Sequence, residues 1–85
     1  MSLEQKHEQK EAARRVRGQV ARRLFDSSML NISVIGANVH FTGVISTLRS
    51  HPHVSLQEEM DTLSKILRQH GIREVVWDVS RRGEV

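Results

Sequence analysis

The sequence contains no cysteine and is poor in aromatic residues and proline, with one tryptophan, two phenylalanines, no tyrosine and one proline among 85 residues. The lack of cysteine excludes disulfide bonds and thiolate metal sites, and it leaves the redox compartment without a signal. No apolar stretch approaches the roughly 20 residues that a membrane-spanning helix needs, and the polar start is not typical of a signal peptide. The sequence therefore predicts no transmembrane segment and leaves the compartment unknown.

Recognisable catalytic and metal-binding motifs are also missing. The sequence has no glycine-rich phosphate loop, no G-x-S-x-G elbow and no H-E-x-x-H pair. His51 and His53 flank the single proline, but no third and fourth ligand lies nearby, whereas a zinc site normally has about four ligands. We therefore predict that the protein is not an enzyme and that it has no metal site and no cofactor.

Two stretches in the middle of the chain alternate between apolar and polar residues, as half-buried strands do. The stretches are residues 30–35 and 39–45, and a compact turn at 36–38 joins them. This pattern predicts a β-hairpin with one apolar face. Gly43 falls on that face, where a strand tolerates glycine when another backbone comes close, and we expect a helix to cross there. The other inward residues are Leu30, Ile32, Val34, Val39, Phe41 and Ile45.

Two further segments have the spacing of amphipathic helices that bury one face. The first helix is predicted from Ala12 onwards, with Phe25 closing the core after it. The second follows a Ser55–Glu58 capping box and ends at Gly71. Their apolar stripes are Ala13, Val16, Val20 and Leu24 in the first helix and Leu56, Met60, Leu63 and Leu67 in the second.

A last alternating stretch, residues 72–79, predicts a third strand, so that the chain reads as an α+β domain. We expect an α-β-β-α-β two-layer sandwich, in which two helices cover one face of a three-stranded sheet. Residues 1–11 are predicted to form a flexible polar lead-in, residues 12–80 a single domain and residues 81–85 a tail. The hairpin makes the first two strands neighbours, but the pattern leaves open which of them the third strand joins.

The stretch 39–45, Val-His-Phe-Thr-Gly-Val-Ile, resembles the V-x-L-x-G-x-V strand of the BON domain, a bacterial module of osmotic-stress and secretin-associated envelope proteins. The family's second motif is a G-V pair at a helix end followed by V-x-x-l-x-V, and residues 71–72 and 75–79 are similar to it. The sequence departs from the family at Asn38, where the family usually has glycine, and in a longer loop at 47–54. The similarity covers residues 13 to 80 and includes the order of the elements.

The resemblance implies a non-enzymatic module, with phospholipid interaction or the assembly of envelope complexes as its roles. It also implies a bacterial cell envelope or periplasmic setting and a connection with stress response. It supplies no catalytic residue and no cofactor for this chain.

The first predicted helix carries five arginines in ten residues without an acidic residue among them. Such a run would attract the phosphates of lipid or nucleic acid, although a solvated helix face is the more common explanation of a run of charges. Arg17 lies at the margin of the buried stripe. Because aromatic anchors are few, our first hypothesis is docking on anionic phospholipid headgroups without insertion into the bilayer. The candidate contact residues are Arg14, Arg15, Arg22 and Arg23.

A second hypothesis is a protein-interaction or assembly module. Ile35, Val44 and Val76 are predicted on the sheet face that points away from the helices, where they would form a small apolar patch for a partner or for self-association. A free edge strand would also accept a strand from a partner. Nucleic-acid binding ranks below both hypotheses, because the sequence has no G-x-x-G loop and predicts no aromatic platform. The oligomeric state stays open.

Overall fold

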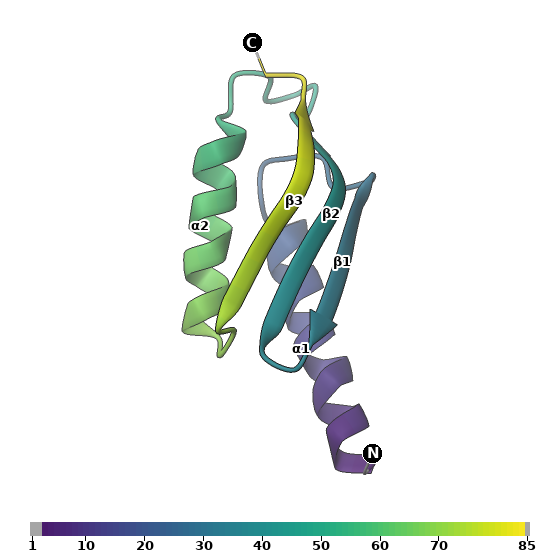
Figure 1. Cartoon of the computed structure of the whole chain (residues 1–85). Coiled ribbons are helices and arrows are strands. Elements are labelled where there is room, and N and C mark those ends of the chain that lie inside the picture. The colour runs from purple at the N-terminus through teal and green to yellow at the C-terminus, as the bar shows by residue number, and fades with distance from the viewer. Residues whose placement is uncertain (1–2, 85) are drawn as a thin grey trace.

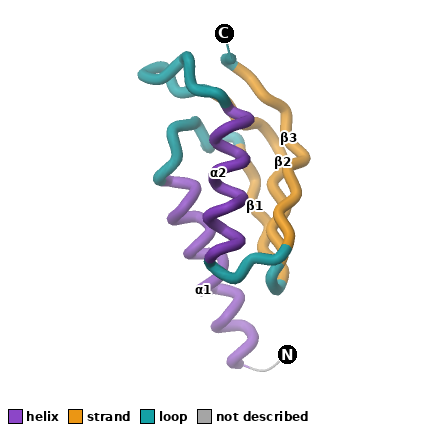
Figure 2. The backbone as a smooth tube through the Cα atoms, turned by 90° about the vertical axis from the view of Figure 1, so that its left-hand side faces the viewer, coloured by secondary structure: helices purple, strands orange, loops and turns teal. Residues whose placement is uncertain are grey.

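The computed structural model describes residues 3–84, and it contains the five elements in the predicted order (Figure 1). The fold is α+β as predicted, with both helices of this part of the chain on one face of a three-stranded sheet, as the side view in Figure 2 shows. The elements are α1 (Leu3–Ala21), β1 (Leu30–Ile35), β2 (Asn38–Ser46), α2 (Leu56–Gln69) and β3 (Glu74–Arg82).

The sheet has the strand order β1-β2-β3, so that the hairpin strand β2 lies in the centre. β1 pairs with β2 antiparallel, whereas β3 pairs with β2 parallel after the crossover through α2. β3 begins beside the hairpin turn, because the backbone N–H of Arg73 donates to the carbonyl of Ala37 at 2.7 Å. The structure thus answers the question that the sequence left open: the third strand joins the second.

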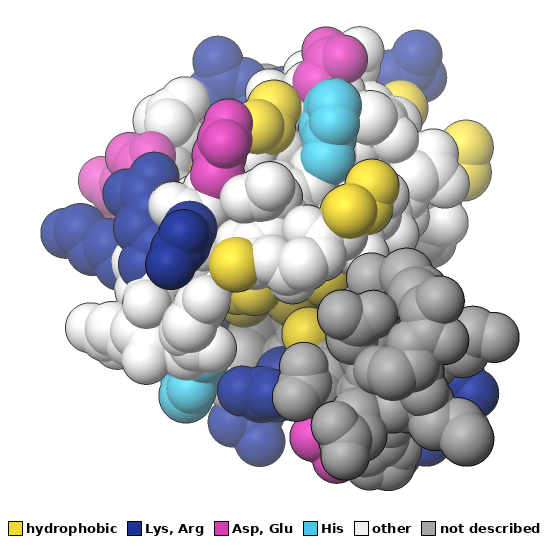
Figure 3. All heavy atoms as spheres, turned by 60° about the horizontal axis from the view of Figure 1, so that its bottom comes forward, with side chains coloured by type: hydrophobic (Ala, Val, Ile, Leu, Met, Phe, Trp, Pro, Cys, Tyr) yellow, Lys and Arg dark blue, Asp and Glu magenta, His cyan; other side chains and the backbone are white. Residues whose placement is uncertain are grey.

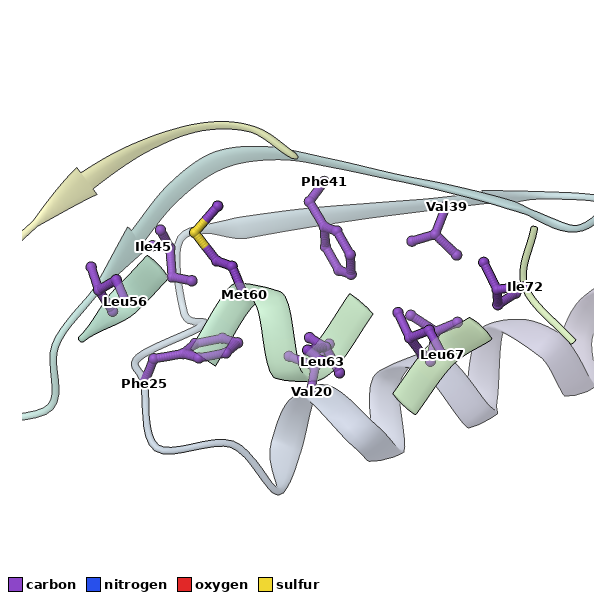
Figure 4. Close-up of a cluster of buried hydrophobic side chains, with 11 residues drawn as sticks. Val20, Phe25, Val39, Phe41, Ile45, Leu56, Met60, Leu63, Leu67 and Ile72 are labelled. Carbon is purple, nitrogen blue, oxygen red and sulfur yellow. The ribbon is translucent and has the colours of Figure 1, made fainter. Parts of the chain in front are cut away.

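The core lies between the central strand and the two helices, and Figure 4 shows the side chains of β2 pointing towards those of α2 and α1. Phe41 is fully buried and stacks on Trp77 of β3, with ring centroids 4.0 Å apart and ring planes 13° apart. The indole N–H of Trp77 donates to the hydroxyl of Ser64 at 2.8 Å, so that this half-buried polar atom has a partner. The buried apolar residues are Val16, Val20, Phe25, Val39, Phe41, Ile45, Leu56, Met60, Leu63, Leu67 and Ile72.

α2 has the start and the end that its sequence predicts. Ser55 is the N-cap residue, and its hydroxyl accepts a hydrogen bond from the backbone N–H of Glu58 at 3.2 Å. After the helix, Gly71 has a φ of 90°, which glycine adopts without steric cost. Four apolar residues of α2 predicted as its stripe are buried, which ties the helix to the sheet.

The first helix differs from the prediction at both ends. α1 begins at Leu3 and not at Ala12, so the part of the predicted lead-in from residue 3 is helical, while residues 1 and 2 lie outside the described residues. The predicted flexibility rested on the lack of apolar residues that could be buried. However, residues 3–11 consist mostly of Glu, Gln and Lys, whose intrinsic propensity favours a helix. α1 ends at Ala21, so Leu24 lies beyond it and is 44% exposed, and its predicted place in the core is wrong. Phe25 is buried instead, as expected.

Residues 81 and 82 were predicted to belong to a tail, but they belong to β3, which continues to Arg82. The parallel ladder extends to the pair of Ser46 with Arg82, which the prediction had missed by ending the strand at Val79. Beyond the ladder, the hydroxyl of Thr47 donates to the carbonyl of Gly83 at 2.9 Å. The end of β3 is therefore held by the loop that follows β2.

The prediction for Gly43 is right about a close backbone and wrong about the element that supplies it. It has a φ of 94°, and a methyl group added there would collide with the backbone carbonyl of Met29. Another backbone does come close, but it is the residue that precedes β1 and not a helix. The positive φ turns the substituent position of Gly43 towards its neighbour in the sheet, which explains why glycine is needed within a strand.

Candidate interaction surfaces

Three of the four candidate arginines are exposed, Arg14 and Arg15 on α1 and Arg22 directly after it. Arg14 and Arg15 project from neighbouring positions of α1. Arg22 is the first residue after the helix, in a turn where its backbone N–H donates to the carbonyl of Gln19 at 3.2 Å. By contrast, Val16 and Val20 of α1 are buried against the rest of the domain. Within residues 10–84 no hydrogen bond or ion pair occupies the side chains of these three arginines. They form the basic surface of α1, to which Arg17, also exposed, adds a neighbouring charge.

Arg23, the fourth candidate, has a different role. Its guanidinium donates to both carboxylate oxygens of Glu59 in α2, from Nη2 at 2.9 Å and from Nε at 3.3 Å. The backbone N–H of Leu24 donates to the same carboxylate at 2.8 Å. The side chains of Arg23 and Glu59 are only 21% and 11% exposed. Arg23 therefore connects the segment that follows α1 to the first turn of α2. In this arrangement its guanidinium is not available to bind a headgroup.

The surroundings of Glu59 keep its carboxyl group ionised. The hydrogen bonds from the Arg23 side chain are the largest effect, and together with the N–H of Leu24 they lower the pKa of Glu59, while burial acts in the opposite direction. The carboxylate is thus an anion, and the guanidinium of Arg23 compensates its charge directly. This is the expected state of a buried charge, which is paired and hydrogen-bonded when it occurs.

The sequence patterns did not predict the Arg23–Glu59 pair, although the position of Glu59 indicates that it needs a partner. Glu59 follows Leu56 by three residues and precedes Leu63 by four, which places an acidic residue within the buried stripe of α2. An acidic residue at such a position requires a basic partner from another element. The charge pattern along the chain instead predicts Arg23 as one of the surface arginines.

The proposed apolar patch on the outer face of the sheet is not continuous. Ile35 is 69% exposed and Val76 is 38% exposed, while Val44 is half-buried. The register places each of them in a different row across the sheet, because Ile35 is opposite Asn38 and Val76 is opposite His40. Polar side chains therefore separate the three apolar residues, and this arrangement gives no extended apolar surface.

The space-filling view from the end with the hairpin turn and the C-terminal end of α2 shows a similar mixture (Figure 3). Hydrophobic side chains appear as separate groups among polar ones, and basic side chains lie at several places round the rim with acidic side chains near most of them. No large area of one kind covers this end, as far as the described side chains show.

Residues 10–84, whose side chains the structure describes, contain no group of three His, Asp or Glu side chains placed to hold a metal ion. Over residues 3–84, no helix is both long enough and apolar enough to cross a membrane. Comparison with models of protein families, with curated proteins and with solved structures finds no match to this chain.

Proposed function

We propose that this chain is a non-enzymatic binding module, related to the BON domain of bacterial envelope proteins, that docks on anionic phospholipid headgroups through the basic surface of α1. The observation that carries the proposal is the exposure of Arg14 and Arg15 on α1 and of Arg22 directly after it, with no side-chain hydrogen bond or ion pair to any of the three within residues 10–84. Arginine suits this role because its planar guanidinium binds phosphate in a bidentate manner.

The expected strength follows from the number of available arginines. Each basic residue near an anionic membrane surface contributes about 1 kcal/mol, so three contribute about 3 kcal/mol, which is about a 100-fold change in the partition coefficient. The Debye length is about 10 Å at 0.1 M salt, so binding of this kind weakens strongly between low and physiological ionic strength. The module docks on the surface of the membrane, since its three aromatic side chains are turned to the core: Phe25 and Phe41 are buried, and Trp77 stacks on Phe41.

Co-sedimentation with vesicles tests the proposal. The wild-type chain is compared at low and physiological salt on vesicles of phosphatidylcholine alone and of phosphatidylcholine with phosphatidylglycerol. The variant replaces Arg14, Arg15 and Arg22 by serine and leaves Arg23 in place, because loss of the Arg23–Glu59 pair would disturb the fold. We expect binding only to the anionic vesicles at low salt, and its loss in the variant.

A matched control removes the same number of positive charges from another exposed region. The variant Lys65→Ser/Arg68→Ser/Arg73→Ser changes α2 and the residue that precedes β3, all of them exposed. We expect this control to retain most of the binding. Equal losses in the two triple variants would show that only net charge matters, and absence of wild-type binding at low salt would refute the proposal in favour of a solvated helix face.

A further inference from the structure

The two edges of the sheet differ in how they are protected against pairing with another strand. β3 forms one edge and carries charged side chains at Glu74, Asp78, Arg81 and Arg82. Charges of this kind are a common device by which proteins prevent pairing at an edge. β1 forms the other edge, and its sequence Leu-Asn-Ile-Ser-Val-Ile has neither charge nor proline. Only the β1 edge lacks this protection along its whole length.

The backbone of β1 also has hydrogen-bonding groups free at this edge. The N–H of Val44 donates to the carbonyl of Met29 at 2.9 Å, so this pair belongs to the hydrogen-bonded series of the β1–β2 ladder. Hydrogen-bonded and non-hydrogen-bonded pairs alternate in an antiparallel ladder. Leu30, Ile32 and Val34 therefore direct their backbone groups away from β2. Of these groups, only the N–H of Leu30 has a partner among the described residues, the carbonyl of Ser27 at 3.0 Å.

The sequence of β1 is complementary to itself when two copies run antiparallel about a two-fold axis at Ile32. This register places Leu30 opposite Val34 of the second copy, and the inward residues of β1 are only partly buried in one copy. It also places Met29 opposite Ile35 of the second copy. Met29 and Ile35 are 66% and 69% exposed, the highest values among the exposed large hydrophobic residues of the described chain.

We propose that β1 pairs in this register with β1 of a second copy of the chain, which joins the two sheets into one of six strands. The groups that point to the free edge are those that the register requires: the N–H of Ile32 bonds the carbonyl of Ile32 in the other copy, and the N–H of Val34 bonds the carbonyl of Leu30. Each bond occurs twice because the interface is isologous.

A second copy fits this edge better than an arbitrary strand for two reasons. No like charges meet across the junction, because β1 has no charged residue. In this register the inward residues of one copy lie opposite inward residues of the other. The inner faces of both sheets are therefore on the same side, and their cores continue across the junction. The formal charge of +3 on each copy opposes association, so this dimer strengthens with salt, whereas docking on headgroups weakens.

Sedimentation equilibrium from about 10 to about 500 μM tests the proposal, because an interface of this small size gives a weak complex. Two double variants at exposed positions distinguish the register. Met29→Lys/Ile35→Lys places like charges opposite each other at both ends of the junction, and Met29→Lys/Ile35→Glu places opposite charges there. Circular dichroism checks that both variants keep the fold.

We expect the wild type to form a dimer, the Lys/Lys variant to raise its dissociation constant about tenfold or more, and the Lys/Glu variant to restore association at low salt. A wild type that stays monomeric throughout overturns the proposal. A wild-type dimer that both variants leave unchanged also overturns it, because the copies then meet through another surface. Neither result bears on the vesicle experiment, since the proposal does not rest on headgroup binding.

Discussion

Replacing Glu59 by glutamine tests how much the Arg23–Glu59 pair stabilises the packing of α1 on α2. The substitution keeps the size of the side chain and removes its charge. In the wild type, the carboxylate accepts two hydrogen bonds from Arg23 and one from the backbone of Leu24. The amide of glutamine keeps one oxygen as an acceptor, but its NH₂ group replaces the oxygen that accepts from Nη2 of Arg23, and it no longer compensates the charge of the guanidinium.

The expected loss follows from the burial of the two side chains. A hydrogen bond to a charged group contributes about 1.5–3 kcal/mol, and the cost of breaking an ion pair rises with its burial. The Arg23 side chain is 21% exposed and can turn partly towards water, so we expect a loss of about 2 kcal/mol in the free energy of unfolding. A domain of this size has a total stability of about 4–13 kcal/mol. The melting temperature should fall by about 8–16 °C.

Urea unfolding as a function of pH separates the charge effect from packing. The pKa of Glu59 in the folded chain lies below its ordinary value of 4.5, so the ionised carboxylate stabilises the fold above that pH, and this stabilisation is lost as the pH falls through the folded-state pKa. Glutamine does not titrate. The difference between wild type and variant is therefore largest above pH 4.5 and shrinks in acid. Asp26, whose pKa is lowered by the N–H of Ser28, titrates in both proteins and cancels.

Glu58→Gln is the matched control, since it removes the same charge from the neighbouring position of α2, where the side chain is exposed. We expect it to change stability by less than about 0.5 kcal/mol, as substitutions on a surface usually do. Equal losses in the Glu58 and Glu59 variants, or a difference between Glu59→Gln and wild type that does not shrink in acid, would refute the reasoning.

Three single substitutions test the backbone and capping arguments by urea unfolding. Gly43→Ala should cost about 2 kcal/mol, because alanine is strained at positive φ and its methyl group meets the carbonyl of Met29; an unchanged midpoint would contradict the close approach. Gly18→Ala, in a helix with nothing within 4 Å of the added methyl group, should instead stabilise by up to about 1 kcal/mol, and a loss there would be the contrary result. Ser55→Ala should cost about 1 kcal/mol, and no cost would mean that the cap is dispensable.

The elements that the sequence predicted well are those with local signals. The β1–β2 hairpin follows from alternation on both sides of a short turn, and α2 follows from its apolar stripe and the cap at Ser55. The end of α1 was predicted poorly, because Leu24 continues the helical spacing although the helix has already ended at Ala21. Spacing alone does not reveal where a helix stops.

The contacts between distant parts of the chain lay beyond local signals. Arg23 and Glu59 are 36 residues apart, and they meet only because α1 and α2 lie on the same face of the sheet. The position of β3 beside β2 likewise depends on how α2 crosses over the sheet. The sequence therefore predicted correctly that three of the four candidate arginines are exposed. The different role of Arg23 depends on how the two helices pack, which the sequence pattern does not show.

The parallel pairing of β2 with β3 has a consequence for the order in which the sheet forms. In the hairpin, Ile35 meets Asn38 across the turn, and each later pair is only slightly more distant along the chain. Between β2 and β3 every pair, from Asn38 with Glu74 to Ser46 with Arg82, spans the same long separation. The entropy of closing this loop must be offset before the first such pair forms. We expect a folding nucleus made of the hairpin and α2, with β3 as the strand that closes the sheet last.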